Sequence, residues 1–195
     1  MRILYVHGYN GEAYGSSYCH LKNAAGDRHE VLSVDYDAEN PREAIATIRK
    51  AVQELGIDAV IGASLGGFLT MHVFGVSRII VNPCWDPAKE LPLVGYTGDI
   101  GVYSELLEEF KQHTDFEEKN LCCVCIAPLD ELLGERYRNE LAKHFSSVYE
   151  ISGGHRICKD SAEEIVNKYL LLHDENVSTF VNQLRGMYNL PMWDI

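Results

Sequence analysis

The chain has 195 residues, of which 46% are hydrophobic and 24% charged, and it carries a formal net charge of −12 at pH 7. This length and composition predict a single globular domain over residues 1–195. The excess of acidic residues argues against binding to nucleic acid, because phosphate binding needs a concentrated basic surface. The first apolar run, Ile3–Val6, is too short for a signal peptide, and no run reaches the roughly 18 residues of a membrane span. We therefore expect a cytoplasmic protein.

Short apolar runs alternate with helical patterns along almost the whole chain. Six runs predict strands: Arg2–Val6, Glu30–Val34, Ala59–Gly62, Arg78–Val81, Leu121–Ala127 and Ser147–Ile151. Several of them are continuously apolar, as expected for strands that are covered on both faces. The alternation predicts an α/β fold with about six mainly parallel strands and helices on both faces. In such a sheet the residues just after each strand form the working site.

Helical spacing of apolar residues is clearest over residues 41–55, where Pro41 suits the first helical turn. Similar patterns predict helices over residues 104–113, 132–145 and 160–172, and a further helix begins at about residue 68. About forty residues separate the fourth and fifth predicted strands, far more than a simple loop needs. We expect residues 84–119 to form an insertion that overhangs the site at the carboxyl ends of the strands.

The six cysteines predict neither a disulfide framework nor a zinc site. Cys122 and Cys123 lie side by side in a predicted strand, so their side chains point to opposite faces and cannot bind one metal. We interpret the cysteines as small buried residues in a reducing compartment. Cys158 lies three residues after His155, close to the predicted site, but packing is the simpler interpretation of this residue as well.

The motif Gly-x-Ser-x-Gly occurs once with the right context, from Gly62 to Gly66. A serine at a sharp turn between a strand and a helix needs small residues two positions before and after it, because the strained backbone leaves no room for side chains. A strand is predicted before Ser64 and a helix after it. We therefore predict that Ser64 is a nucleophile of the α/β-hydrolase type.

A nucleophilic serine needs a general base, and the base needs an acid that orients it. In this fold the order along the chain is Ser, then Asp or Glu, then His, each in a loop after a later strand. Asp130 and His155 meet that requirement, and we predict that they complete a catalytic triad. Asp86, after the fourth strand, is an alternative acid, and Glu131 is a weaker one.

The oxyanion of a tetrahedral intermediate needs two N–H donors. We expect one from the backbone of Leu65, directly after the nucleophile, and the other from Tyr9 in the loop after the first strand. Gly8 and Gly11 allow this loop to approach the site closely. His7 also follows the first strand, and we expect it to hold the loop by hydrogen bonds rather than to transfer protons.

Several motifs taken together resemble the YqiA/YcfP-like esterases, a compact bacterial branch of the α/β hydrolases. They are Tyr5-Val6-His7-Gly8-Tyr9-Asn10-Gly11, Gly62-Ala63-Ser64-Leu65-Gly66-Gly67-Phe68, Val81-Asn82-Pro83, Tyr96-Thr97-Gly98 and Gly153-Gly154-His155-Arg156. The resemblance runs from residue 1 to about residue 172. It implies a minimal α/β-hydrolase fold without antiparallel strands, no metal and no organic cofactor. Transferred by position, it gives the same triad and implies that Tyr96 and Thr97 contact substrate.

Residues 174–195 form a C-terminal extension beyond the resemblance and end in an apolar segment that contains Trp193. Docking on its own domain is one interpretation of this segment, and formation of a homodimer is the other.

The function that these observations predict is hydrolysis of a small-molecule carboxylic ester or acyl thioester through an acyl-enzyme. A binding or regulatory protein on the same scaffold, with little or no turnover, is the alternative from another class. An acyltransferase would use the same three residues.

Overall fold

The computed structural model describes residues 1–113, 116–172 and 175. Six strands form one sheet in the order β2-β1-β3-β4-β5-β6, and every neighbouring pair is parallel. They are β1 (Arg2–Val6), β2 (Glu30–Ser33), β3 (Ala59–Ala63), β4 (Ser77–Val81), β5 (Cys122–Ile126) and β6 (Ser147–Glu150). The predicted fold class and all six predicted strands are confirmed, with ends that shift by one residue at most.

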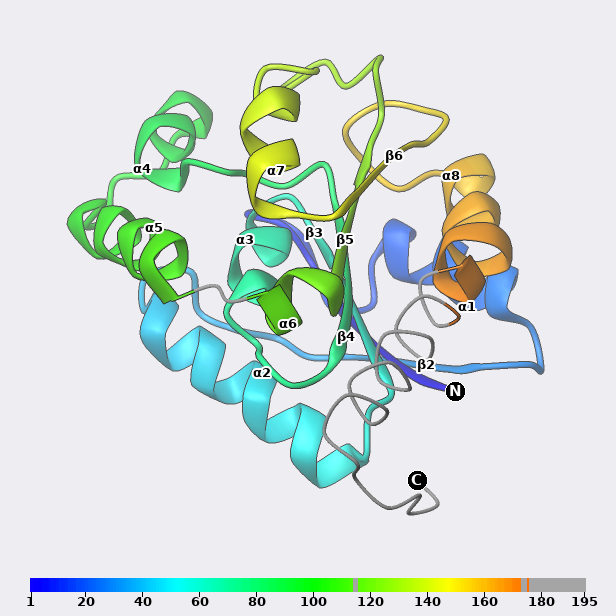
Figure 1. The fold of residues 1–195 in the computed structure, drawn as a ribbon. Helices are drawn as coiled ribbons and strands as arrows, with labels where there is room; N and C mark the ends of the chain where they lie inside the picture. The colour runs from blue at the N-terminus through cyan, green and yellow to red at the C-terminus, as the bar shows by residue number, and fades with distance from the viewer. Residues whose placement is uncertain (114–115, 173–174, 176–195) are drawn as a thin grey trace.

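Helices cover both faces of the sheet (Figure 1). One face carries α1 (Ser16–Ala25), α8 (Lys159–Glu164) and the π-helical turn η2 (Ile165–Tyr169). The other carries α2 (Pro41–Leu55), α3 (Leu65–Met71), α5 (Gly101–His113) and α7 (Arg138–His144). No helix in the described part of the chain is long and apolar enough to cross a membrane.

Alternate strand residues supply two separate hydrophobic clusters, one on each face. In β1, Leu4 belongs to one cluster and Ile3 to the other, and both side chains are fully buried. In β5, Cys122 and Cys123 are divided in the same way, as their adjacent positions predict. Both thiols are free, and burial raises the pKa of Cys122 to about 12, so it packs as a neutral side chain.

In this strand order β1 lies between β2 and β3, so the connections β1–β2 and β2–β3 run in opposite directions across the sheet. The chain leaves β1 for β2 on one side and then crosses back to β3 on the other. Ligands bind at such a switch point in parallel sheets, outside the carboxyl ends of the strands. The register places Val6 beside Gly62 and Ala63 beside Val81, so the loops after β1, β3 and β4 start next to one another.

The predicted insertion over residues 84–119 contributes to the core. It contains α4 (Pro87–Glu90), η1 (Leu91–Val94), α5 and α6 (Phe116–Asn120). Its side chains Trp85, Tyr103 and Phe110 are buried in the cluster that α2 and α3 also form. Buried Glu90 accepts hydrogen bonds from Arg136 and Tyr137 and so joins the insertion to the segment before α7.

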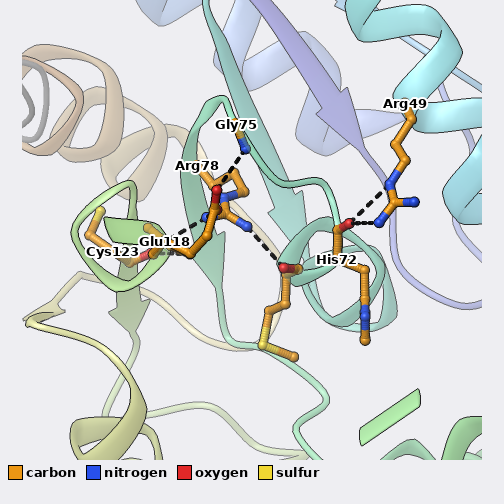
Figure 2. Close-up of polar contacts among 8 residues, drawn as sticks. Arg49, His72, Gly75, Arg78, Glu118 and Cys123 are labelled. Atoms are coloured by element: carbon orange, nitrogen blue, oxygen red, sulfur yellow. Dashed lines mark hydrogen bonds and ion pairs between the residues drawn. The ribbon is translucent and has the colours of Figure 1, made fainter. Parts of the chain in front are cut away.

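A buried arginine connects α6 to the middle of the sheet (Figure 2). Arg78 is 1% exposed and donates to the carbonyl oxygens of Met71 and Glu118, at 2.9 and 3.0 Å, and to the Glu118 carboxylate. The same carboxylate accepts the N–H of Gly75 at 3.0 Å. The end of α3, the turn after it, β4 and α6 are therefore held by one polar cluster.

Several helices differ from the sequence prediction: α3 and α5 begin about three residues earlier than expected, at Leu65 and Gly101, and the short helices α4 and α6 were missed. The helix predicted over residues 132–145 begins only at Arg138, because Gly134 has φ of +54° and the chain turns there. The helix predicted over residues 160–172 continues beyond α8 as the π-helical turn η2. Helix α1 was not predicted. The C-terminal extension lies outside the described residues except for Glu175, so its two interpretations both stay open.

Candidate active site

Ser64 lies at the turn between β3 and α3, with φ of +53° and ψ of −120°. Such a conformation is strained for a residue with a side chain and persists only where its surroundings fix it. Here the Ser64 N–H donates to Val81 O at 2.9 Å, and the Ser64 carbonyl accepts the N–H of Cys84 at 3.0 Å. The turn is thus held by the end of the neighbouring strand β4.

The two glycines of the motif are required by close packing around this turn. A Cβ atom on Gly62 would collide with the Thr70 side chain, and one on Gly66 would collide with the carbonyl groups of Val6 and His7. The predicted reason for the Gly-x-Ser-x-Gly spacing therefore holds in this structure.

Asp130 and His155 come together from the ends of β5 and β6. His155 Nδ1 lies 2.9 Å from Asp130 Oδ2, while Asp130 Oδ1 accepts the N–H groups of Leu132 and Leu133 at 2.8 and 2.9 Å. Burial by itself would raise the pKa of Asp130, but the hydrogen bonds from His155 and Leu133 outweigh it and lower the pKa. The carboxylate stays ionised at neutral pH, and its acceptor oxygen favours the proton on Nδ1, which leaves Nε2 free to accept one.

The two alternative acids have other partners. Glu131 Oε2 accepts the backbone N–H of His155 at 2.9 Å, and this hydrogen bond lowers the pKa of Glu131. Asp86 begins α4 and pairs with Lys89 at 2.6 Å. Among the described residues, only Asp130 hydrogen-bonds to the His155 ring.

Asn82 fixes the loop that carries His155, a role that the sequence analysis missed. Its side chain is buried, with Nδ2 donating to the carbonyl oxygens of Gly154 and His155, both at 3.0 Å, and Oδ1 accepting the N–H of Ala127 at 2.7 Å. The side-chain amide of Asn82 thus joins the ends of β4 and β5 to the loop after β6. The motif Val81-Asn82-Pro83 and the position directly after β4 pointed to this residue, but they did not reveal its hydrogen bonds or its φ of +42°.

The loop after β1 passes directly beside the nucleophile. A Cβ atom on Gly8 would lie 2.9 Å from Ser64 Cβ and 3.4 Å from its Oγ. His7 holds this loop as expected: its Nδ1 hydrogen-bonds to Gly8 O at 2.8 Å, its carbonyl accepts the Tyr36 hydroxyl at 2.7 Å, and its ring stacks on Tyr36. Tyr9 follows Gly8 in this loop and lines the same pocket as Ser64.

One pocket of about 300 Å³ contains Ser64, His155 and this loop. Within the described part of the chain no hydrogen bond joins the Ser64 hydroxyl to His155, and contacts of this kind often tighten only when substrate binds. The other residues that line the pocket are Tyr5, His7, Gly8, Tyr9, Asn10, Gly11, Glu12, Gly15, Ser16, Ser17, Ala63, Arg156 and Ile157.

The remaining predicted site residues lie around this pocket. Leu65 is the first residue of α3, so its N–H belongs to the unpaired amides at a helix start. Tyr96 is buried with its ring against Tyr9 at 5.6 Å, and neither Tyr96 nor Thr97 lines the pocket. Their role in substrate contact stays a prediction.

The parallel sheet, the strained serine turn and the Asp–His pair define an α/β-hydrolase fold. Solved structures support this class. The esterase domain of a Rhodothermus marinus protein is 17% identical with a TM-score of 0.62, over 87% of this chain and 83% of that chain. An α/β hydrolase from the metagenome of lagoon sediments at Mar Chica, Morocco, is 14% identical with a TM-score of 0.61, over 90% of this chain and 91% of that chain.

A third structure, mouse α/β hydrolase domain-containing protein 10, is 18% identical with a TM-score of 0.57 and covers 89% of this chain and 90% of its own. Identities this low establish the fold alone. A family model described as "Uncharacterised protein family (UPF0227)" matches residues 2–159. The chain therefore belongs to this family, the YqiA/YcfP family, which confirms the resemblance seen in the sequence. No curated protein matches the chain.

Proposed function

We propose that this protein is a serine hydrolase that cleaves carboxylic esters or acyl thioesters through an acyl-enzyme. The observation that carries the proposal is the 2.9 Å hydrogen bond between Asp130 and His155, in a site that also contains a serine at a strained strand–helix turn. This combination has a chemical use in nucleophilic catalysis and no evident use in packing.

In the first half of the reaction, Ser64 Oγ attacks the substrate carbonyl carbon while His155 Nε2 takes the hydroxyl proton. Asp130 keeps the imidazole oriented and stabilises the positive charge that forms on it. The carbonyl π electrons move to the oxygen, where the N–H groups of Leu65 and Tyr9 stabilise the negative charge.

Collapse of this intermediate breaks the C–O or C–S bond, and the leaving group takes the proton from His155. The acyl group is then bonded to Ser64. Water repeats the sequence on the acyl-enzyme, with His155 again acting first as base and then as acid, and releases the carboxylic acid.

The direct test compares wild type with Ser64→Ala on p-nitrophenyl esters and acyl thioesters of increasing chain length. We expect the substitution to lower kcat by several orders of magnitude, because the triad acts as a unit. Ser152→Ala is the matched control, since Ser152 is exposed and hydrogen-bonds to Glu164.

Each alternative function has its own outcome in this test. Equal and negligible turnover by wild type and Ser64→Ala would favour a binding protein. Faster acyl-enzyme breakdown with added alcohols or amines, with acylated products, would identify an acyltransferase. Near-wild-type hydrolysis by Ser64→Ala would overturn the proposal.

A further inference from the structure

The pocket beside Ser64 has a polar wall that the proposed triad does not use. Helix α1 begins there: Gly15, Ser16 and Ser17 line the pocket, and no side chain caps the helix. Arg156, directly after His155, lines the same pocket. The start of α1 and the loop after β6 therefore meet at the candidate nucleophile, and Ser17 Oγ contacts the Ile157 carbonyl at 3.4 Å.

Arg156 differs from the other arginines that the structure describes. Each of the others hydrogen-bonds to a protein acceptor: Arg2, Arg28, Arg42, Arg49, Arg78, Arg136 and Arg138. Arg156 has no hydrogen bond or ion pair to any described residue. Arg156 is exposed at the edge of this pocket, so its guanidinium is free to pair with an anionic ligand that enters the pocket.

Tyr5 is a further polar group on this wall of the pocket. Tyr5 is 3% exposed and lines the pocket from β1. Its burial raises the pKa of the hydroxyl, and this rise is reduced by a hydrogen bond with Ser17 and by the positive charge of Arg156. Arg156, Tyr5 and Ser17 thus all line the same pocket, where the guanidinium of Arg156 and the hydroxyl of Tyr5 are potential donors to a ligand.

We propose that this wall binds a carboxylate on the substrate, so that the preferred substrates are esters or thioesters that carry a second, ionised carboxyl group. A planar carboxylate matches the two parallel N–H donors of a guanidinium, and the amides at the start of α1 add further donors. The pocket holds one carboxylate of its own, Glu12, so its charge balance suits a single negative charge better than a phosphate dianion. This inference rests on the proposed function.

The experiment uses two pairs of substrates, and in each pair one member carries a free carboxylate and the other carries its methyl ester. In the first pair the carboxylate is on the acyl side: mono-p-nitrophenyl adipate against its methyl ester. In the second it is on the leaving group: 4-hexanoyloxybenzoate against its methyl ester. The quantity compared is the ratio of kcat/KM for the anionic ester to kcat/KM for the neutral one, because it cancels general effects on the triad.

We expect wild type to favour the anionic ester in one pair by tenfold or more, and that pair shows on which side the carboxylate binds. Arg156→Gln should lower this ratio by about 10- to 100-fold, the effect of losing a charged hydrogen bond, and Arg156→Lys should lower it less. Glu12→Gln should raise the ratio. The control Lys159→Gln removes an exposed cation outside the pocket and should leave it unchanged.

The inference fails if wild type shows no preference in either pair, or if Arg156→Gln leaves the ratio unchanged while neutral esters are still hydrolysed. If no ester is hydrolysed, the proposed function fails instead. Calorimetric measurement of monomethyl adipate binding then tests whether the wall binds a carboxylate. Binding that is lost in Arg156→Gln would support a carboxylate site without turnover, and equal or no binding by the two proteins would overturn it.

Discussion

The candidate site depends on a few side chains that each satisfy one geometric requirement. Ser64 must adopt a positive φ, Asp130 must accept from the imidazole, and Asn82 must hold the loop that presents it. The first two requirements leave a pattern in the sequence, namely the glycine spacing and the order Ser–Asp–His along the chain. The third leaves only the motif Val81-Asn82-Pro83, which does not reveal what Asn82 binds, because Asn82, Ala127 and His155 become neighbours only when the strands align.

Asp130→Asn tests the orienting acid. An amide at this position favours the wrong imidazole tautomer, so we expect kcat to fall by about 10³- to 10⁴-fold with little change in folding. Steady-state kinetics on a p-nitrophenyl ester measure this fall. Glu131→Gln is the comparison, because Glu131 accepts from the backbone N–H of His155 and not from its ring. Equal losses in the two variants would contradict the assignment of Asp130 as the acid.

Asn82→Ala tests the positioning of the histidine loop. The substitution removes both donors to the Gly154 and His155 carbonyls. We expect kcat to fall by about tenfold or more with KM nearly unchanged, because a displaced base acts on the chemical step rather than on binding. Kinetics at a temperature where the variant remains folded, checked by circular dichroism, separate this effect from lost stability. A change in KM alone would show that Asn82 does not position the base.

At the scale of elements, the strands were predictable and the helices less so. Continuous apolar runs such as Ile79-Ile80-Val81 identify strands that are covered on both faces, and their ends follow closely. Helix α1 has a weaker apolar pattern and starts at Gly15 without a capping side chain, so its sequence carries no start signal. The helix expected from residue 132 is delayed because the Leu132 and Leu133 amides turn toward Asp130. Because α1 was not predicted, the sequence did not indicate the polar wall that the start of α1 and Arg156 form in the pocket.

The substitution Arg78→Ala tests whether the buried Arg78–Glu118 pair holds α6 and the turn after α3 to β4. Arg78→Ala would leave the Glu118 carboxylate, whose side chain is 17% exposed, without its buried cation. We expect a loss of about 3 kcal/mol or more in the free energy of unfolding, measured by urea denaturation. The control Lys143→Ala breaks an exposed ion pair with Glu140 and should cost at most about 1 kcal/mol. Similar losses in both variants would contradict a special role for the buried cluster.

At the scale of the whole molecule, acid stability depends on a buried histidine away from the candidate site. Burial lowers the pKa of His72 to about 4, and the charge of Arg49 adds to this effect. In the unfolded chain the pKa is 6.5, so the unfolded state binds the proton first. The stabilisation is complete above pH 6.5 and is lost as the pH falls from there toward 4.

We expect this loss to contribute about 3 kcal/mol to the decrease in unfolding free energy between pH 6.5 and 4. Urea denaturation over this range, with wild type and His72→Gln, measures the contribution. The variant should show a flatter dependence on pH. Parallel curves for the two proteins would show that the pKa of His72 does not differ between the folded and unfolded states.

The central claim is that Ser64 is an activated nucleophile. Labelling with a fluorophosphonate followed by peptide mass spectrometry tests it without knowledge of the natural substrate, because only an activated serine reacts quickly. We predict rapid formation of one adduct on the peptide that contains Ser64, and much slower labelling in His155→Ala. An unlabelled Ser64 in folded wild-type protein, or a label on another serine, would contradict the account.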